Sequence, residues 1–245
     1  MSAAATGATA LRVLTQLRRD PRTVALLLFV PAVLMTLLRF VFDGQKETFD
    51  NLGGPMIGLF PFITMFLVTS ITMLRERTSG TLERLMSMPV GKLDLLSGYG
   101  IAFAVMAALQ ATITAAVAFL ALGLDVGGSP TAVVALAIGN AVLGMSLGLF
   151  ISAFATSEFQ AVQFMPAFVL PQLMLCGLFV ARDQMAGALE AFSDALPLTY
   201  AFDALDRVAA GGEFGGRGWL DVTVILGVTL LALGLGALTL RRRTA

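Results

Sequence analysis

The chain has 245 residues, of which 57% are apolar and 13% are charged, against about 25% charged residues in typical soluble domains. With a mean hydropathy of +0.86, too little polar surface exists to cover a water-soluble globule, and that class is excluded. The 16 basic and 16 acidic residues balance, so nothing favours nucleic acid as a partner. Histidine is absent and Cys176 is the single cysteine, which excludes a Ser–His hydrolase, an H-E-x-x-H metal site and an intrachain disulfide.

The first predicted element is an amphipathic helix over residues 6–19, with a frayed tail as the alternative. Leu11, Leu14 and Leu17 share one helical face and alternate with arginines, a pattern typical of helices that lie in the membrane interface. The first long apolar run starts only at Thr23, later than the apolar region of a cleavable signal peptide, so no such peptide is expected.

Six apolar runs follow, each near the length of about 20 residues that a membrane-spanning helix needs. They cover residues 24–42, 52–74, 95–122, 130–154, 159–180 and 220–240. A polar loop, 43–51, is expected after the first run, and Pro55 and Pro61 predict a kinked or late-starting second helix. Segment 183–209 is too polar to span and reads as short amphipathic helices divided by Pro197. The fold class is therefore an all-α integral membrane protein with six transmembrane helices in one domain, 1–245.

The distribution of basic residues predicts the orientation. With the N-terminus, the 75–94 loop, the 155–158 break and the C-terminus on one side, that side holds 11 of the 16 lysines and arginines. The positive-inside rule assigns it to the cytoplasm, so both termini are expected there. Arginine outnumbers lysine 14 to 2, which hints at a GC-rich bacterial genome and hence at the plasma or inner membrane.

The predicted spans lack charge in their middle. Proton- and ion-coupled carriers keep ionisable residues within the membrane, and an inverted repeat, which would favour a carrier, is also absent. The polar residues that remain are amides, among them Asn140 and Gln163, for which an interhelical hydrogen bond and a substrate contact are the alternatives. Gly144 and Gly148 have the spacing that permits close helix packing.

The segment 75–92 is the strongest functional signal. Gly80 permits a turn after the charged end of the second span, and 81–86 reads as a short helix that Pro89 ends. Such a helix suits docking into a groove on a soluble partner; the alternative is a solvated loop that only sets topology.

Two motifs resemble the permeases of the type 2 ABC exporter family, which includes daunorubicin-resistance-type multidrug exporters. One is Glu76-Arg77-x-x-Gly80-Thr81-Leu82-Glu83-x-Leu85-x-x-x-Pro89, which in that family follows the second span. The other is Leu196-Pro197-Leu198-Thr199-Tyr200-Ala201-x-Asp203-Ala204-Leu205, between the fifth and sixth spans. The resemblance covers essentially the whole chain.

The resemblance implies a non-catalytic membrane subunit with no cofactor of its own. ATP and magnesium would be bound by a separate ATP-binding subunit, two copies of which would work with two permease chains, identical or paralogous, in the lipid bilayer. Segment 6–19 would be the connecting helix, 183–209 the re-entrant helices, and 75–92 the coupling segment. The residues expected to contact the ATPase are Arg75, Glu76, Arg77, Gly80, Thr81, Leu82, Glu83, Arg84, Leu85, Met86 and Pro89. Within this set, Leu82, Leu85 and Met86 would be the buried anchors.

A soft apolar surface suggests the cargo. The expected substrate-pathway residues are Phe62, Met65, Phe66, Asn140, Gln163, Phe164, Phe168 and Met174. Phenylalanine and methionine surfaces adapt to varied apolar ligands, so hydrophobic or amphipathic cargo is favoured, although plain helix packing explains the same residues. The competing interpretations are an autonomous channel or secondary carrier for a small apolar solute, and an intramembrane enzyme or assembly factor.

Overall fold

The computed structural model describes residues 2–87 and 91–239, and the side chains of Glu83 and Met86 fall outside the description. Its described residues form helices and no strands. The elements in chain order are α1 (Ala3–Arg18), α2 (Pro21–Val41), α3 (Lys46–Thr78), α4 (Thr81–Met86), α5 (Lys92–Ala116) continued by the π-helical turn η1 (Val117–Ala121), α6 (Pro130–Ile151), α7 (Glu158–Leu175), the 3₁₀ turn η2 (Arg182–Gln184), α8 (Gly187–Ser193), α9 (Pro197–Ala209) and α10 (Gly215–Leu238).

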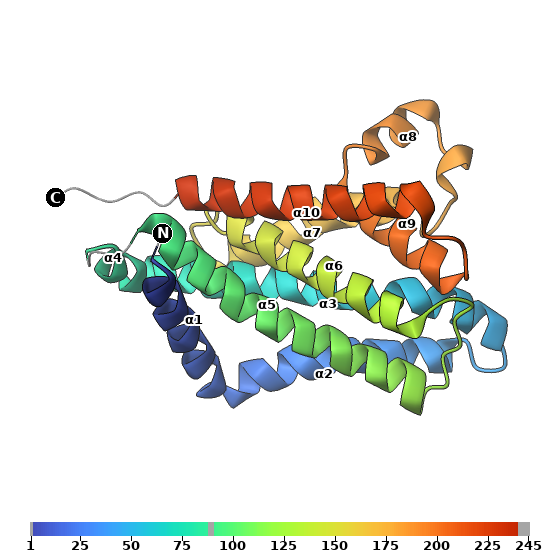
Figure 1. Ribbon diagram of the computed structural model, residues 1–245, viewed down its shortest axis with the longest axis horizontal. Helices are drawn as coiled ribbons and strands as arrows, with labels where there is room; N and C mark the ends of the chain where they lie inside the picture. The colour runs from blue at the N-terminus through green and yellow to red at the C-terminus, as the bar shows by residue number, and fades with distance from the viewer. Residues whose placement is uncertain (1, 88–90, 240–245) are drawn as a thin grey trace.

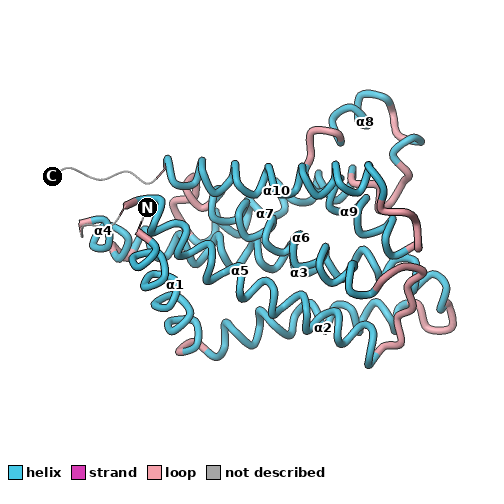
Figure 2. Tube along the Cα trace, viewed as in Figure 1, coloured by secondary structure: helices cyan, strands magenta, loops and turns pink. Residues whose placement is uncertain are grey.

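The long helices lie side by side along one axis and form a bundle (Figure 1). One end of the bundle carries α1 and α4, and we call it the α4 end. The other end carries the α2–α3 turn and α9, with α8 standing away from the bundle on loops, and we call it the α8 end (Figure 2).

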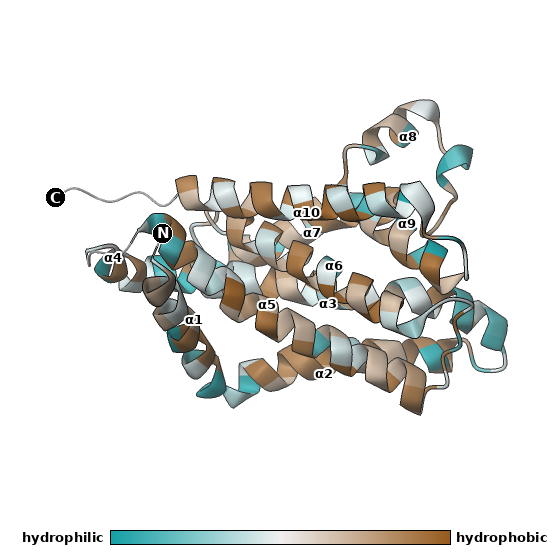
Figure 3. Ribbon diagram, in the orientation of Figure 1, coloured by the Kyte–Doolittle hydropathy of each residue, from teal (hydrophilic) through white to brown (hydrophobic). Residues whose placement is uncertain are grey.

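Five helices of the described chain are long and apolar enough to cross a membrane: α2, α3, α5 with η1, α6 and α10. Apolar residues run along their lengths, whereas polar residues gather toward the two ends of the bundle (Figure 3). This distribution is that of a multi-pass membrane protein, because the lipid-facing length of a spanning helix must be apolar. The sixth expected span corresponds to α7, which is less apolar because it contains three glutamines and two prolines.

The second spanning helix differs from its expected form. Instead of a polar loop over 43–51 and a late start, α3 begins at Lys46 and runs through Pro55 and Pro61 for 33 residues. The polar first turns are stabilised by an ion pair of 2.6 Å between Lys46 and Asp50. At 1.5 Å per residue α3 is about 50 Å long, so it projects beyond the roughly 30 Å hydrocarbon layer.

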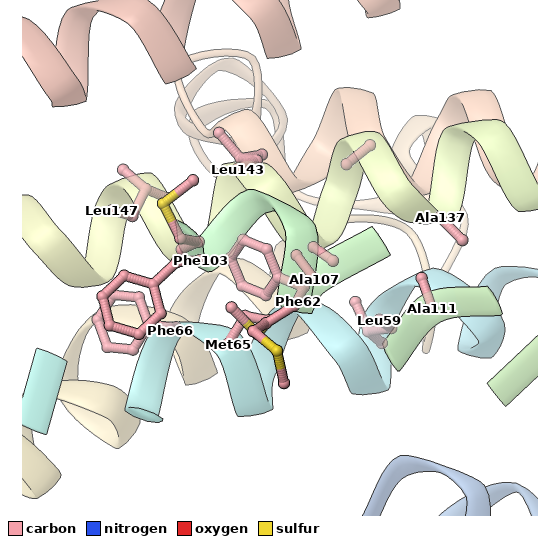
Figure 4. Packing of buried hydrophobic residues seen from close by; sticks show 14 of the residues in the cluster. Leu59, Phe62, Met65, Phe66, Phe103, Ala107, Ala111, Ala137, Leu143 and Leu147 are labelled. Atoms are coloured by element: carbon pink, nitrogen blue, oxygen red, sulfur yellow. The ribbon is translucent and has the colours of Figure 1, made fainter. Parts of the chain in front are cut away.

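The core lies where α3 crosses α6. Phe62, Met65 and Phe66 of α3 are fully buried against α5 and α6 (Figure 4). The predicted close packing at Gly144 and Gly148 is confirmed, since a Cβ atom at Gly144 would lie 2.3 Å from the carbonyl oxygen of Phe62. The Thr69 hydroxyl also donates to the carbonyl of Met145, 3.3 Å away, and ties the two helices together.

Candidate functional site at the α4 end of the bundle

The turn from α3 to α4 is built on Gly80. Its φ of +72° lies in the left-handed region that glycine adopts without strain. The hydroxyls of Ser79 and Thr81 hydrogen-bond across this turn at 3.0 Å. Leu82 is 4% exposed and belongs to the core of this chain, whereas Arg84 is exposed. The helix is therefore seated on the bundle by Leu82 and presents other residues outward.

Arg75, in the last turn of α3, binds Glu158 at the start of α7. The guanidinium donates from Nε to one carboxylate oxygen at 2.7 Å and from Nη2 to the other at 2.9 Å. Both side chains are more than half exposed, so this bidentate pair defines the relative position of two helices more than it stabilises them.

Glu76 turns in the opposite direction and is buried beneath α1. Its Oε1 accepts a hydrogen bond of 3.1 Å from Gln16, and its Oε2 lies 3.7 Å from Nη2 of Arg12. Arg12 also donates to the hydroxyl of Tyr99 in α5, and its guanidinium lies 5.4 Å from the centre of that ring. One partly buried network thus joins α1, α3 and α5, and we call its four residues, Arg12, Gln16, Glu76 and Tyr99, the Glu76 network.

Contacts at the start of α5 bring α1 close to that helix. A Cβ atom at Gly98 would lie 2.5 Å from Cβ of Thr9, so only glycine permits this approach. The backbone N–H of Ser2 donates to Asp94 at 3.0 Å. At the far end of α1, Asp20 caps α2 by accepting from the hydroxyl and the backbone N–H of Thr23, which lowers the pKa of the Asp20 carboxyl.

A cavity of about 190 Å³ lies under α1. Its lining includes Gln16 and Asp20 from the α1 side, Arg75 and Glu76 from α3, and Thr81 from α4. The cavity lies between the α1–α2 corner and the α3–α4 turn.

The side chain of Arg77 contacts the C-terminal end of the last helix, α10. Its Nη2 donates to the hydroxyl of Thr239 at 3.3 Å, while its buried Nε has no hydrogen-bond partner among the described residues. Three consecutive residues near the end of α3, 75–77, therefore contact α7, α1 and the end of α10 respectively, and Arg12 of α1 extends these contacts to Tyr99 of α5.

The structure divides the predicted coupling residues into two groups. Glu76 and Leu82 face the interior of this chain, so neither is available to a partner in this conformation, and Arg77 is half-buried. The outward-facing members are Arg75, Thr81 in part, and Arg84, while Leu85 is half-buried against the core. Pro89 lies outside the described residues, and the side chains of Glu83 and Met86 do as well.

The predicted substrate-pathway residues do not form one surface. Phe62, Met65 and Phe66 are enclosed in the core, and Phe66 stacks on Phe168 of α7 with ring centroids 6.2 Å apart. Gln163, Phe168 and Met174 are exposed on α7, and Phe164 is half-buried. Packing explains the aromatic face of α3, because its rings fill the space between α3, α5, α6 and α7.

Asn140 is a different case. It is fully buried in α6 beside Gly58 of α3, and neither atom of its amide has a hydrogen-bond partner within the described chain. Gln110 and Gln172, by contrast, make the interhelical hydrogen bonds expected of amides in spans, to Thr64 and to the backbone N–H of Leu198. A buried amide without hydrogen bonds carries a desolvation cost, so a bound polar group or a water molecule that hydrogen-bonded to Asn140 would lower the free energy.

Sequence reasoning missed Asp221. It lies at the start of the predicted span 220–240, where it is fully buried in α10, and neither carboxylate oxygen accepts a hydrogen bond from the described residues. Arg217, one turn earlier, lies 3.8 Å from Asp221 and 3.4 Å from Asp203 of α9. The signal available in the sequence was the spacing of four residues between Arg217 and Asp221 at the start of an apolar run. Among the described residues, no group of three or more histidine, cysteine, aspartate or glutamate side chains could hold a metal ion.

The bundle is that of a polytopic helical membrane protein. A short helix, α4, lies at one end of it, next to the turn of α3 that contacts several other helices. The model of the ABC-2 type transporter family matches residues 5–208, from α1 through most of α9. The chain therefore belongs to the ABC-2 type transporter family, and the resemblance found in its sequence is confirmed.

Three relatives illustrate the family. The linearmycin resistance permease protein LnrN of Bacillus subtilis is 27% identical over 86% of this chain and 52% of its own length. The probable multidrug ABC transporter permease YbhR of Escherichia coli is 27% identical over 62% of this chain and 42% of its own length. ABC transporter G family member 20 of Dictyostelium discoideum is 25% identical over 81% of this chain and 28% of its own length. The chain thus spans about half the length of these relatives, or less.

Proposed function

We propose that this chain is the membrane-spanning subunit of an ATP-driven ABC exporter for hydrophobic or amphipathic cargo. Membership of the ABC-2 type transporter family carries this proposal. The names of two relatives, one for linearmycin resistance and one for multidrug transport, support the cargo class.

In this proposal α7 is the sixth span, and the α4 end faces the cytoplasm together with both termini. The basic residues favour this orientation, because 11 of 16 fall on that side. An 18-residue helix rises about 27 Å, which is close to the thickness of the hydrocarbon layer. The segment with η2, α8 and α9 would dip into the outer leaflet, since exposed Phe179, Leu189 and Phe192 need an apolar surrounding there.

The ATP-binding subunit would dock on α4, with two copies serving two permease chains. The exposed side of the helix offers Arg84 and the half-exposed Thr81, and Arg75 lies next to the turn. The buried Leu82 would fix α4 to the bundle, so that a displacement of α4 by the ATP-binding subunit would also move α3. ATP and magnesium would be held by that partner.

Co-purification tests the docking surface. We expect the chain to co-purify with a P-loop ATPase encoded beside it, and Arg84→Cys, in a Cys176→Ala background, to cross-link to that subunit. The matched control is Arg22→Cys, another exposed arginine of the α4 end on a different helix. Transport by the purified chain without any ATPase would instead support an autonomous carrier.

A further inference from the structure

A groove lies between α6 and α10 on the side of the bundle, toward the α8 end. It has a volume of about 390 Å³, and all nine residues that line it are apolar. Trp219 and Leu226 of α10 form one wall and are 66% and 56% exposed, so the groove opens outward. Phe214 meets the Trp219 ring edge to face, with centroids 5.4 Å apart, and closes the end of the groove.

Small residues on α6 create the space. Ala132, Ala135 and Gly139 line the groove, and a Cβ atom at Gly139 would meet no atom within 4 Å. Gly144, five residues later, faces the tight contact with α3 instead. The two glycines therefore have opposite roles: one permits helix contact, and the other leaves a hollow.

We propose that this groove binds an acyl chain of a membrane phospholipid. Both walls belong to helices that are long and apolar enough to span the membrane, so the solvent that faces the opening is hydrocarbon. The Trp219 ring lies in the first turns of α10, the position where tryptophan marks the boundary between headgroups and acyl chains. The groove then descends from that boundary along α6 and α10, the direction in which an acyl chain runs.

The lining excludes other kinds of ligand. A polar cargo or an extended peptide would need hydrogen-bond partners, and the groove's lining side chains provide only the Trp219 N–H. A flexible hydrocarbon chain needs none and gains dispersion contacts with every apolar side chain that lines the hollow. This inference depends on the membrane character of α6 and α10 and does not depend on the export function.

Trp219 is the single tryptophan of the chain, so its fluorescence reports on the groove directly. The full chain is reconstituted in vesicles of phosphatidylcholine whose acyl chains carry bromine, a contact quencher, next to unbrominated vesicles. We expect strong quenching in the unaltered chain and a clear, partial loss of it in Gly139→Leu, which fills the hollow. The control is Gly234→Leu, an exposed glycine of α10 outside the groove that also has no atom within 4 Å of its Cβ position, and it should be quenched like the unaltered chain.

Two results would overturn the proposal. Equal quenching in all three proteins would mean that lipid touches only the outer face of Trp219. Weak quenching in the unaltered chain that rises when the protein is diluted in lipid would mean that a second copy covers the groove. Should Gly139→Leu fail to fold, Ala135→Leu fills the same hollow from an exposed position of α6 and decides between the same outcomes.

Discussion

Gly144 shows how a single residue sets the distance between the two central helices. Alanine at this position would place its Cβ 2.3 Å from a backbone oxygen of α3, which cannot move aside as a side chain can. We expect Gly144→Ala to destabilise the protein by about 1–3 kcal/mol, the usual cost of overpacking. Thermal unfolding in detergent measures the effect. Gly139→Ala on the same helix is the control and should unfold at nearly the original temperature; equal loss in both variants would contradict the packing argument.

The Asp221 carboxylate is buried and accepts no hydrogen bond from the described residues, and Arg217 lies 3.8 Å from it. A buried charge is costly, and the neutral amide of Asp221→Asn removes the charge while keeping the size. We expect this variant to be at least as stable as the unaltered chain. Arg217→Ala leaves both Asp221 and Asp203 without this cation and should be the less stable variant by about 1–2 kcal/mol. The reverse order of melting temperatures would show that the charge of Asp221 is itself required.

The Glu76 network acts between elements, and its contribution depends on burial. The Arg12–Glu76 pair has a separation of 3.7 Å, with only 5% of the Glu76 side chain exposed. The Arg39–Asp43 pair has nearly the same separation, 3.6 Å, but 81% of the Asp43 side chain is exposed. Double-mutant cycles to alanine should give a coupling of about 1 kcal/mol for the first pair and close to zero for the second. Equal couplings would mean that the network does not hold α1 to α3.

The proposed function also depends on the turn between α3 and α4. Gly80 has φ +72°, whereas proline is restricted to values near −65°. We expect Gly80→Pro to leave membrane insertion intact while ATP hydrolysis by the partner no longer drives efflux. Glu83→Ala should have the same effect if its charge contacts the partner.

Gly80→Asn is the matched control, because asparagine tolerates the left-handed region and a side chain at this position meets no atom within 4 Å. Efflux assays in vesicles measure all three variants. Full ATP-driven efflux in Gly80→Pro and Glu83→Ala would remove the basis for placing the partner on α4.

At the scale of elements, hydropathy was enough to predict a helical membrane fold, because about 20 consecutive apolar residues leave few alternatives. It misjudged the start of α3, where polar residues continue the helix beyond the apolar run, with Phe49 buried and Lys46 paired with Asp50. The orientation of individual side chains could not be predicted from the sequence in the same way. Whether Leu82 and Glu76 face inward or outward depends on where α1 and α3 lie, and neither residue's own neighbours in sequence contain that information. The same holds for Asp221, whose burial is caused by packing against other helices.

At the scale of the whole molecule, the number of crossings depends on α7. If α7 spans, the α6–α7 break lies on the same side as the α3–α4 turn, and η2 lies on the other side with the α2–α3 turn. Cys176 is buried and is the single cysteine, so Cys176→Ala gives a background for site-specific labelling. Cysteines placed one at a time at Ser79, Thr156, Gly44 and Asp183 then report the side of each segment.

With a membrane-impermeant maleimide applied to intact cells, we expect Gly44→Cys and Asp183→Cys to react, and Ser79→Cys and Thr156→Cys to react only after lysis. All four positions lie outside the helices expected to span and are exposed, so differences in labelling reflect the side of the membrane and not burial within the bundle. If Thr156 and Asp183 react from the same side, α7 does not cross. The α4 end and the C-terminal end of α10 would then lie on opposite sides, which is incompatible with the hydrogen bond between Arg77 and Thr239. The labelling result therefore tests the six-span topology and the geometry of the α4 end together.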